Sequence, residues 1–191
     1  MFVWKEHDSP FDFKYLKFLF YATEHMKEHM LNSIQDTTDT TDTDGMTEIR
    51  QAFLTGERAE FFARKRRYVD TVFADGESPL KHACDIELVE SSFKWKYPLW
   101  YCRNVVARDC TWFEMGRAGV WYTDHIVVED STIEAPKNFR RCHDVVLRNV
   151  DFPNAEETLW SCSGVRLENV SAHGDYLASN CADVKADNLR L

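Results

Sequence analysis

A repeat of about twenty residues restricts the fold of this sequence more than any other feature, because residues that recur once per copy must share one structural position. A clear copy runs from Asp85 to Phe93 and reads Asp-Ile-Glu-Leu-Val-Glu-Ser-Ser-Phe. We align the copies on the apolar residue in the second position, the anchor, and successive anchors are 19, 21, 19, 20 and 19 residues apart. The anchors are Ile86, Val105, Ile126, Val145, Val165 and Val184. A short, regular period of this kind predicts a solenoid.

The pattern inside each copy predicts strands. The anchor and the residue two positions later are apolar, as in Ile86 and Leu88, and charged residues mostly take the alternate positions. The residue before the anchor is usually one that tolerates a left-handed turn, such as Asp85. A second apolar column precedes the anchors by six residues, at Leu80, Leu99, Val120, Phe139, Leu159 and Ala178. We therefore predict an all-β fold, a single-stranded right-handed parallel β-helix with at least two strands in each coil of about 20 residues.

The chain divides into two regions. Residues 1–45 form an N-terminal extension, in which helical spacing of apolar residues predicts a helix over Phe13–Gln35 and a Thr/Asp-rich run predicts a flexible linker over Asp36–Gly45. Residues 46–191 form the β-helix. Leu191 falls on an inward position with no polar cap after it, which favours a β-helix that is shortened at its C-terminus. The sequence leaves open whether residues 1–45 belong to the natural protein.

Several phrases of the sequence together resemble one family. They are Thr55–Phe62, Phe73–Leu80, Phe93–Cys102, Gly116–Tyr122 and Ile133–Arg141. In combination they resemble a bacterial domain-of-unknown-function family with a pectin-lyase-like β-helix, over residues 46–191. The resemblance implies the same fold, and it brings no established activity and no catalytic residues. The sequence departs from the repeat at Arg66, which stands where other coils have an apolar anchor.

Charge and composition exclude some classes of partner. The net charge of −9 argues against a general nucleic-acid binder and against a protein of anionic membrane surfaces. No apolar run reaches the length of a membrane span, and the N-terminus lacks the pattern of a secretory signal. We therefore expect a cytoplasmic protein whose six cysteines are reduced.

The cysteines follow the repeat and do not form a metal-binding pattern. Cysteines three residues before an anchor should stack along one line, which does not surround a metal ion tetrahedrally. We predict a buried column of small residues, with no metal and no cofactor. A helical His25-Met-Lys-Glu-His29 segment matches an inverted zinc-protease motif, and we interpret that match as accidental because no third ligand is recognisable. The column holds Ala83, Cys102, Thr123, Cys142, Cys162 and Cys181.

The residues just after the second apolar column are the best candidates for ligand binding. If that column points inward, the next side chains point outward and form a stripe along the solenoid. Aromatic rings suit ring-shaped ligands such as sugars, and guanidinium groups suit carboxylates or phosphates. The predicted ligand is a carbohydrate or an anionic small molecule. The candidate residues are Trp100, Tyr101, Trp121, Tyr122, Arg140, Arg141 and Trp160.

Two other functions remain open. Loops before the stripe offer Glu114, Arg117, Glu156 and Glu157 as weak catalytic candidates for a polysaccharide lyase or a glycosidase-like enzyme. Alternatively, the protein is a structural scaffold that self-associates, as a homo-oligomer, through the aromatic stripe or the solenoid ends. A binding protein needs accessible aromatic side chains, an enzyme also needs an acid or base beside them, and a scaffold buries them.

Overall fold

The described part of the chain, in a computed structural model, comprises residues 40–41 and 45–191. The chain divides into two compact units, residues 1–37 and 38–191, and only the second contains described residues. The predicted helix over Phe13–Gln35 and the His25–His29 motif therefore lie outside the described residues. Within the predicted linker, Thr40–Thr41 form strand β1, which pairs antiparallel with β2.

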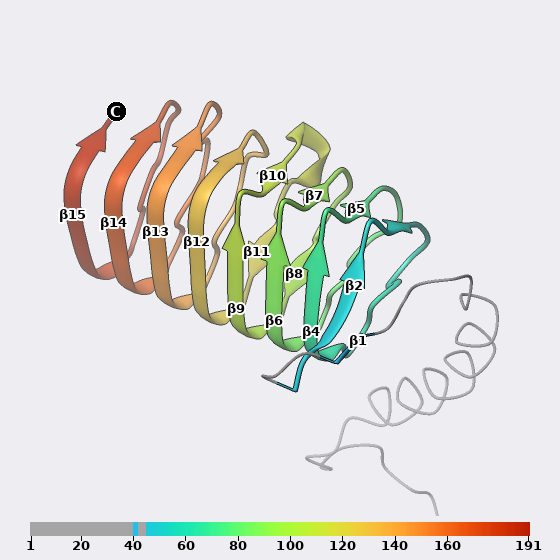
Figure 1. The fold of residues 1–191 in the computed structure, drawn as a ribbon. Helices are drawn as coiled ribbons and strands as arrows, with labels where there is room; N and C mark the ends of the chain where they lie inside the picture. Colours follow the sequence, from blue (N-terminus) through green and yellow to red (C-terminus); the bar gives the residue numbers. More distant parts are fainter. Residues whose placement is uncertain (1–39, 42–44) are drawn as a thin grey trace, which may run out of the picture. The chain divides into compact units, whose positions relative to one another are not determined.

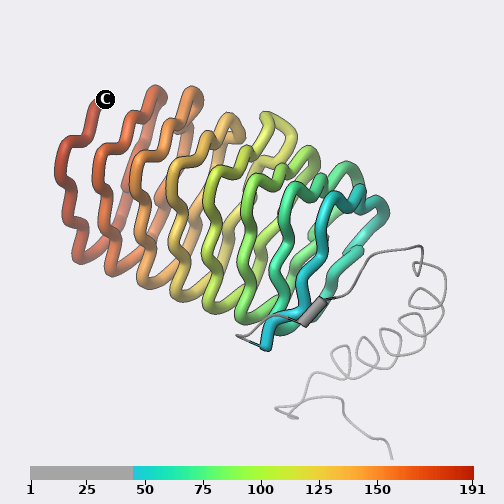
Figure 2. The backbone as a smooth tube through the Cα atoms, viewed as in Figure 1, coloured from blue at the N-terminus to red at the C-terminus, as the bar shows by residue number. Residues whose placement is uncertain are grey.

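The described unit is a parallel β-solenoid in which the chain winds through successive coils, as Figures 1 and 2 show. The chain rises along the front strands, returns behind them and advances by one coil each time, so the solenoid is right-handed (Figure 1). This confirms the predicted fold. One strand per coil forms the front sheet: β2 (Thr47–Arg50), β4 (Arg64–Val69), β6 (Cys84–Val89), β9 (Arg103–Arg108), β12 (Asp124–Ile133), β13 (His143–Phe152), β14 (Ser163–Ala172) and β15 (Ala182–Arg190).

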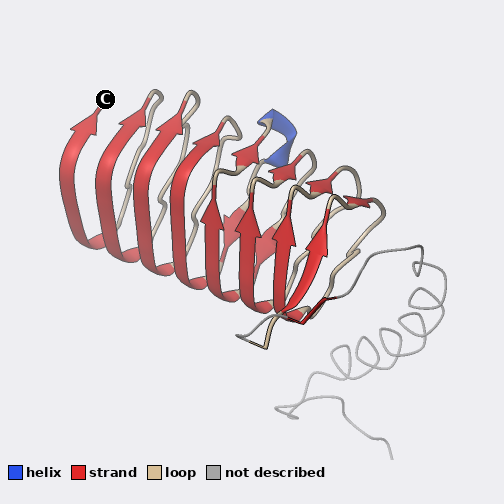
Figure 3. Ribbon diagram, in the orientation of Figure 1, coloured by secondary structure: helices blue, strands red, loops and turns tan. Residues whose placement is uncertain are grey.

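Shorter strands complete the coils, and Figure 3 shows how they alternate with the connecting loops. In the early coils a two-residue strand follows each front strand after a bend, whereas β12, β13 and β14 continue through that bend. Strands β8 and β11 form a separate two-stranded sheet on the returning side of the coils. Among the described residues, no helix is long and apolar enough to cross a membrane. The short elements are β3 (Phe53–Leu54), β5 (Val72–Phe73), β7 (Ser92–Phe93), β8 (Leu99–Trp100), β10 (Thr111–Trp112), β11 (Val120–Trp121) and the 3₁₀ helix η1 (Glu114–Gly116).

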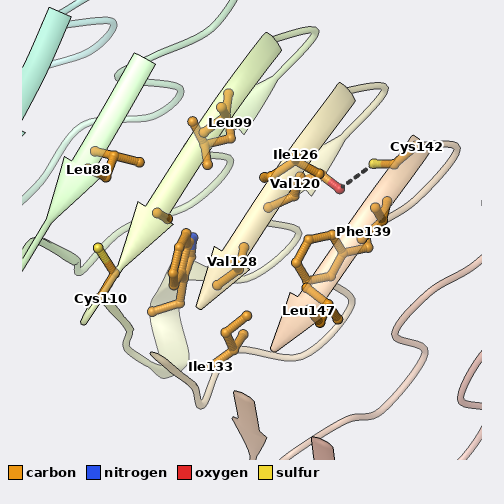
Figure 4. Close-up of a cluster of buried hydrophobic side chains, with 14 of the residues drawn as sticks. Leu88, Leu99, Cys110, Val120, Ile126, Val128, Ile133, Phe139, Cys142 and Leu147 are labelled. Atoms are coloured by element: carbon orange, nitrogen blue, oxygen red, sulfur yellow. Dashed lines mark hydrogen bonds between the residues drawn. The ribbon is translucent and has the colours of Figure 1, made fainter. Parts of the chain in front are cut away.

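The core is a set of stacked inward columns. Anchors pair with anchors in neighbouring strands, and Val105, Ile126 and Val145 are all fully buried. Figure 4 shows anchors and second-column residues packed together. Each such large apolar side chain contributes roughly 2–3 kcal/mol when it is removed from water. A buried row of aromatic rings adds to this packing, with Phe93 stacked 4.7 Å from Phe73 and 5.0 Å from Trp112 between ring centroids.

The solenoid begins two coils before Ile86, the first apolar anchor of the repeat, because Thr47 pairs with Arg66 and Arg66 with Ile86. Strand β2 pairs in register with β4, and Arg66 takes the anchor register opposite Ile86, as predicted. Polar side chains satisfy one another in this first part of the interior. The Tyr68 hydroxyl donates to a Glu60 carboxylate oxygen at 2.7 Å, and an Arg66 nitrogen lies 3.4 Å from the same oxygen. Those contacts explain why the apolar repeat could not be recognised there.

Differences in coil length are concentrated in one corner. The chain takes six positions from Phe93 to Leu99 but eight from Trp112 to Val120, and η1 occupies the longer connection. The rest of each coil has constant length. The inward residue seven positions after the anchor, such as Phe93 or Trp112, recurs in successive coils, and the second apolar column always precedes the anchor by six positions. We call the segment between that inward residue and the second apolar column the variable corner.

Turns in the solenoid use left-handed backbone at fixed places. The residue before the anchor has a positive φ, for example 58° at Asp85 and 55° at Asn104, which confirms that prediction. A second column of the same kind lies where the long strands bend. There the amide of Asn169 donates to Asn149 at 3.2 Å and accepts from Asn188 at 2.7 Å. Asn and Asp tolerate this conformation better than other residues with a side chain.

Candidate functional site

Two parallel rows of side chains lie on the outer surface of the turn that follows the second apolar column. Leu99 is fully buried, Trp100 is half-buried and Tyr101 is exposed, so the chain passes from core to surface within three residues. Backbone pairing repeats this arrangement in neighbouring coils. We call the two rows together the ladder. Its first row is Lys81, Trp100, Trp121, Arg140 and Trp160, and its second row is Phe62, His82, Tyr101, Tyr122 and Arg141.

In the first row, rings and a guanidinium group stack on one another. The Trp100 and Trp121 rings are 5.0 Å apart between centroids and inclined by 5°. The guanidinium carbon of Arg140 lies 5.1 Å from the Trp121 ring and 5.5 Å from the Trp160 ring. The faces of Trp121 are therefore both in contact with neighbours. A ligand on this row would meet ring edges rather than open ring faces.

The indole N–H groups of this row are bound within the protein. Trp100 donates to the carbonyl of Ala118 at 2.6 Å, and Trp121 donates to the carbonyl of Lys137 at 2.9 Å. Both acceptors belong to the variable corner of the next coil. These bonds fix the two rings and leave the cationic groups as the polar part of the row.

The second row is built on left-handed backbone at bulky residues. Tyr101, Tyr122 and Arg141 have φ angles of 58°, 55° and 51°. The two tyrosine rings stack at 4.8 Å with an interplanar angle of 4°, and the Arg141 guanidinium carbon lies 5.9 Å from the Tyr122 ring. Left-handed backbone costs roughly 1–2 kcal/mol at residues of this kind. Stacking of aromatic pairs, worth about 0.5–1.5 kcal/mol each, offsets much of this cost.

The structure places all seven predicted ligand-binding residues on the ladder, and it adds three that the sequence analysis missed. Lys81 and His82 directly follow Leu80 of the second apolar column, as Trp100 and Tyr101 follow Leu99. Phe62 extends the second row by a further coil. The signal for Lys81 and His82 was therefore present in the repeat, and it was overlooked because these residues do not continue the Trp-Tyr pattern.

The cations of the ladder contact aromatic rings instead of carboxylates. Within residues 45–191, no carboxylate oxygen lies within the 4.0 Å ion-pair distance of the side-chain nitrogens of Lys81, Arg140 or Arg141. The front sheet is different, because there Arg148 binds Glu129 and Glu168, each at 2.8 Å. In a protein with a net charge of −9, carboxylates are abundant, so the ladder is a distinct electrostatic environment.

The four weak catalytic candidates lie beside the ladder without forming a joint site. Glu114 belongs to η1, and Arg117 follows it; both are exposed. Glu156 is exposed as well, whereas Glu157 pairs with Lys137 at 3.1 Å. No hydrogen bond or ion pair joins any two of these four candidates in the described solenoid. Their catalytic role stays a prediction.

The predicted cysteine column is buried and has structural contacts. The thiols of Cys102, Cys142 and Cys162 each donate to a second-column carbonyl one coil earlier, and the Cys142 bond to Val120 at 3.4 Å is drawn in Figure 4. Burial raises the pKa of the Cys102 thiol to about 12. Among the cysteines of the column, Cys102, Cys142 and Cys162 are buried, and Cys181 is partly accessible.

Two shallow depressions are found away from the ladder, on the front sheet. The larger one has a floor that includes Val106, Val127 and Val146, with His125 at its rim. The smaller one continues toward Lys185. Neither of these two depressions includes a ladder residue.

Comparison with protein families assigns the solenoid to a known group of sequences. Residues 47–191 match the model of the family described as "Protein of unknown function (DUF3737)". The chain belongs to this family. The DUF3737 match begins at Thr47, the first residue of β2, so it covers the solenoid from its first front strand. No curated protein matches the sequence. The function of this DUF3737 member must therefore be argued from its own surface.

Proposed function

We propose that the ladder binds an anionic ligand, and that an acidic carbohydrate is the class it suits best. The observation that carries this proposal is that Arg140 and Arg141 contact the rings of Trp121, Trp160 and Tyr122 and have no carboxylate partner among the described residues. With this function we propose the finer relationships that the sequence suggests: a bacterial protein of the pectin-lyase-like type, located in the cytoplasm.

A guanidinium group that lies over an aromatic ring keeps its hydrogen-bond donors at its edge. Arginine has five N–H donors in one plane, and a carboxylate or phosphate accepts two of them side by side. Arg140 and Arg141 are adjacent in sequence and belong to different rows of the ladder. They therefore offer two donor groups to one extended anion. Contacts with the rings also hold the side chains in place, which reduces the entropy lost on binding.

The same geometry supports an acidic ligand better than a neutral sugar. A neutral sugar gains most from lying flat on an open aromatic face, and the faces of Trp100 and Trp121 are stacked together. Tyr101 and Arg141 remain exposed at the surface. A ligand along the ladder would therefore contact ring edges and cationic groups, and charge would decide its affinity.

The test compares an acidic with a neutral tetrasaccharide by isothermal titration calorimetry of the full chain. Tetragalacturonate is expected to bind, and cellotetraose is not. In the double variant Arg140→Gln/Arg141→Gln, affinity for tetragalacturonate should fall at least about tenfold, since each lost charged hydrogen bond is worth about 1.5–3 kcal/mol. Arg148→Gln is the matched control, because it removes an arginine that is paired on the front sheet.

Three outcomes would contradict this proposal: equal affinity for both sugars, equal loss in Arg148→Gln, or no binding of tetragalacturonate. Trp121→Ala then distinguishes the scaffold alternative. If the stripe is an interface between copies, Trp121→Ala should change the oligomeric state measured by light scattering. A binding protein should keep its oligomeric state in that variant and lose ligand affinity.

A further inference from the structure

The end of the ladder opposite to Arg140 and Arg141 carries a histidine in an unusual setting. The His82 ring lies between two aromatic rings, 5.1 Å from Phe62 at 14° and 5.1 Å from Tyr101 at 19°. Both faces of the imidazole are therefore in contact with neighbouring rings. Within the described solenoid, neither ring nitrogen of His82 makes a hydrogen bond. The stacking holds the ring in place, Phe61 packs edge-on against it at 5.8 Å between ring centroids, and the His82 side chain remains partly accessible.

Positive charges surround this histidine. Lys81 places its ammonium nitrogen 5.9 Å from the Trp100 ring and 5.6 Å from the Tyr101 ring. Burial lowers the pKa of His82, and the charges of Lys81, Arg64 and Arg58 lower it further. The pKa of Lys81 is lowered by burial and by Arg58, while Glu57 acts in the opposite direction. These effects favour the neutral form of His82, and the neighbouring cations would stabilise a negative charge beside it.

We propose that Lys81 and His82 form an anion site for a phosphate or sulfate monoester group, and that His82 takes up a proton when the group binds. This site lies on the same ladder but uses neither Arg140 nor Arg141, the residues that carry the function proposed above, so it can be tested independently of that function. A tetrahedral oxyanion presents acceptors in several directions, which matches an ammonium group and an imidazole edge better than a planar carboxylate does.

Proton uptake follows from the electrostatics of the site. A bound dianion adds attraction for the imidazolium form and reduces the effect of the neighbouring cations, so it raises the pKa of His82. By linkage, the anion must then bind more tightly at lower pH. If binding raises the pKa by about one unit, affinity increases about tenfold as pH falls through that range.

The experiment is a titration of the histidine resonances of the full chain by NMR, with and without 20 mM sulfate and at constant ionic strength. Sulfate stays dianionic over the pH range of the titration, so a change in the presence of sulfate reports the protonation of the protein and not of the anion. A second arm with inorganic phosphate compares the two oxyanions. His82→Gln assigns the resonance. His125 and His143 are internal controls, because they pair with Asp144 at 3.0 Å and with Asp124 at 2.7 Å on another turn.

The expected result is a pKa of His82 below the ordinary histidine value without anion, and a rise of about one unit with sulfate or phosphate. Lys81→Gln should abolish most of that rise, and Arg140→Gln/Arg141→Gln should keep it. The inference is wrong if the His82 pKa does not respond. It is also wrong if His125 and His143 respond equally, which would indicate an adventitious ion only, or if the arginine double variant loses the response. Loss of tetragalacturonate binding, by contrast, bears only on the proposed function.

Discussion

Single residues of this protein adopt unfavourable conformations where a column of neighbours compensates them. Tyr101 and Tyr122 have left-handed backbone, and their rings stack at 4.8 Å on successive coils. A tyrosine with left-handed backbone and no ring stacked on it would lower the free energy of unfolding, with no contact to offset that loss. The identity of each ladder residue is therefore determined by the residues above and below it, and less by its neighbours in sequence.

The buried thiols give a prediction at this scale. Burial raises the pKa of Cys102 to about 12 and that of Cys110 to about 11. A raised folded-state pKa contributes stability that is fully present below the unfolded value, near 9, and is lost as pH rises toward the folded value. The free energy of unfolding should fall above pH 9, by about 1.4 kcal/mol per pH unit for each such thiol.

Urea unfolding at pH 8 and at pH 10.5 checks this expectation with Cys102→Ala. The variant should be less stable than the natural chain at pH 8, by about 1–2 kcal/mol for the lost packing, and should show a shallower decline with pH. Parallel pH profiles for the two proteins would show that Cys102 keeps its ordinary pKa and that the expectation is wrong.

Residue positions were predictable where the repeat is apolar and regular, and less so elsewhere. The sequence correctly assigned the second column, which is buried from Leu80 to Leu159 and partly buried at Ala178 in the last coil, because its members are apolar in every predicted coil. It could not show that Trp100 and Trp121 cover one another's faces, since ring orientation depends on side-chain contacts between coils. It placed Arg66 at an anchor position correctly, but it could not show that this side chain pairs with Glu60.

At the scale of elements, the front strands and their bends form the most regular part of the molecule. Strands β12, β13 and β14 run through the bend without interruption, and the sequence analysis predicted only that each coil has at least two strands. A front strand and the short strand after it form one continuous strand only if backbone hydrogen bonds persist at the bend. Hydrophobic periodicity in the sequence does not show whether those bonds form. In these coils Asn149 and Asn169 link the bends by their amides.

Substitutions at Asn169 test what holds the bend. Asn169→Ala removes two side-chain hydrogen bonds and places alanine, which tolerates left-handed backbone less well than asparagine, at φ 54°, so it should cost about 2 kcal/mol. Asn169→Gly loses the same bonds but adopts that conformation freely, so it should cost about half as much. Urea denaturation measures both, with the exposed Arg166→Ala as control. A glycine variant less stable than the alanine variant would contradict this explanation.

For the molecule as a whole, the important property is that coils stack in strict register while one corner varies in length. The unequal anchor spacings arise in this corner: the connection is eight positions from Trp112 to Val120 and seven from Phe152 to Leu159, against six from Phe93 to Leu99. The structure shows that the 3₁₀ helix η1 fills the longest of these connections. The front strands pair residue by residue in register, whereas this corner accommodates connections of different lengths.

Single-residue insertions distinguish the corner from the sheet. A serine inserted between Glu114 and Met115, both exposed, should change the melting temperature by less than about 5 °C. A serine inserted between Val127 and Val128 in β12 reverses the faces of all later residues of that strand. Melting followed by circular dichroism should then show a loss of at least about 10 °C, and equal effects of the two insertions would contradict this account.

The strict register also turns the solenoid into a measure of length. Lys81 and Arg140 occupy the same row, with Trp100 and Trp121 between them, so they are three coil steps apart. At about 4.8 Å per step, their charges are separated by about 14 Å along the axis. A molecule with acidic groups at both ends can reach both cations only if its own span matches that interval. If the ladder binds a ligand as proposed, gain or loss of one whole coil between the two cations would change the matching ligand span by a single step of about 4.8 Å.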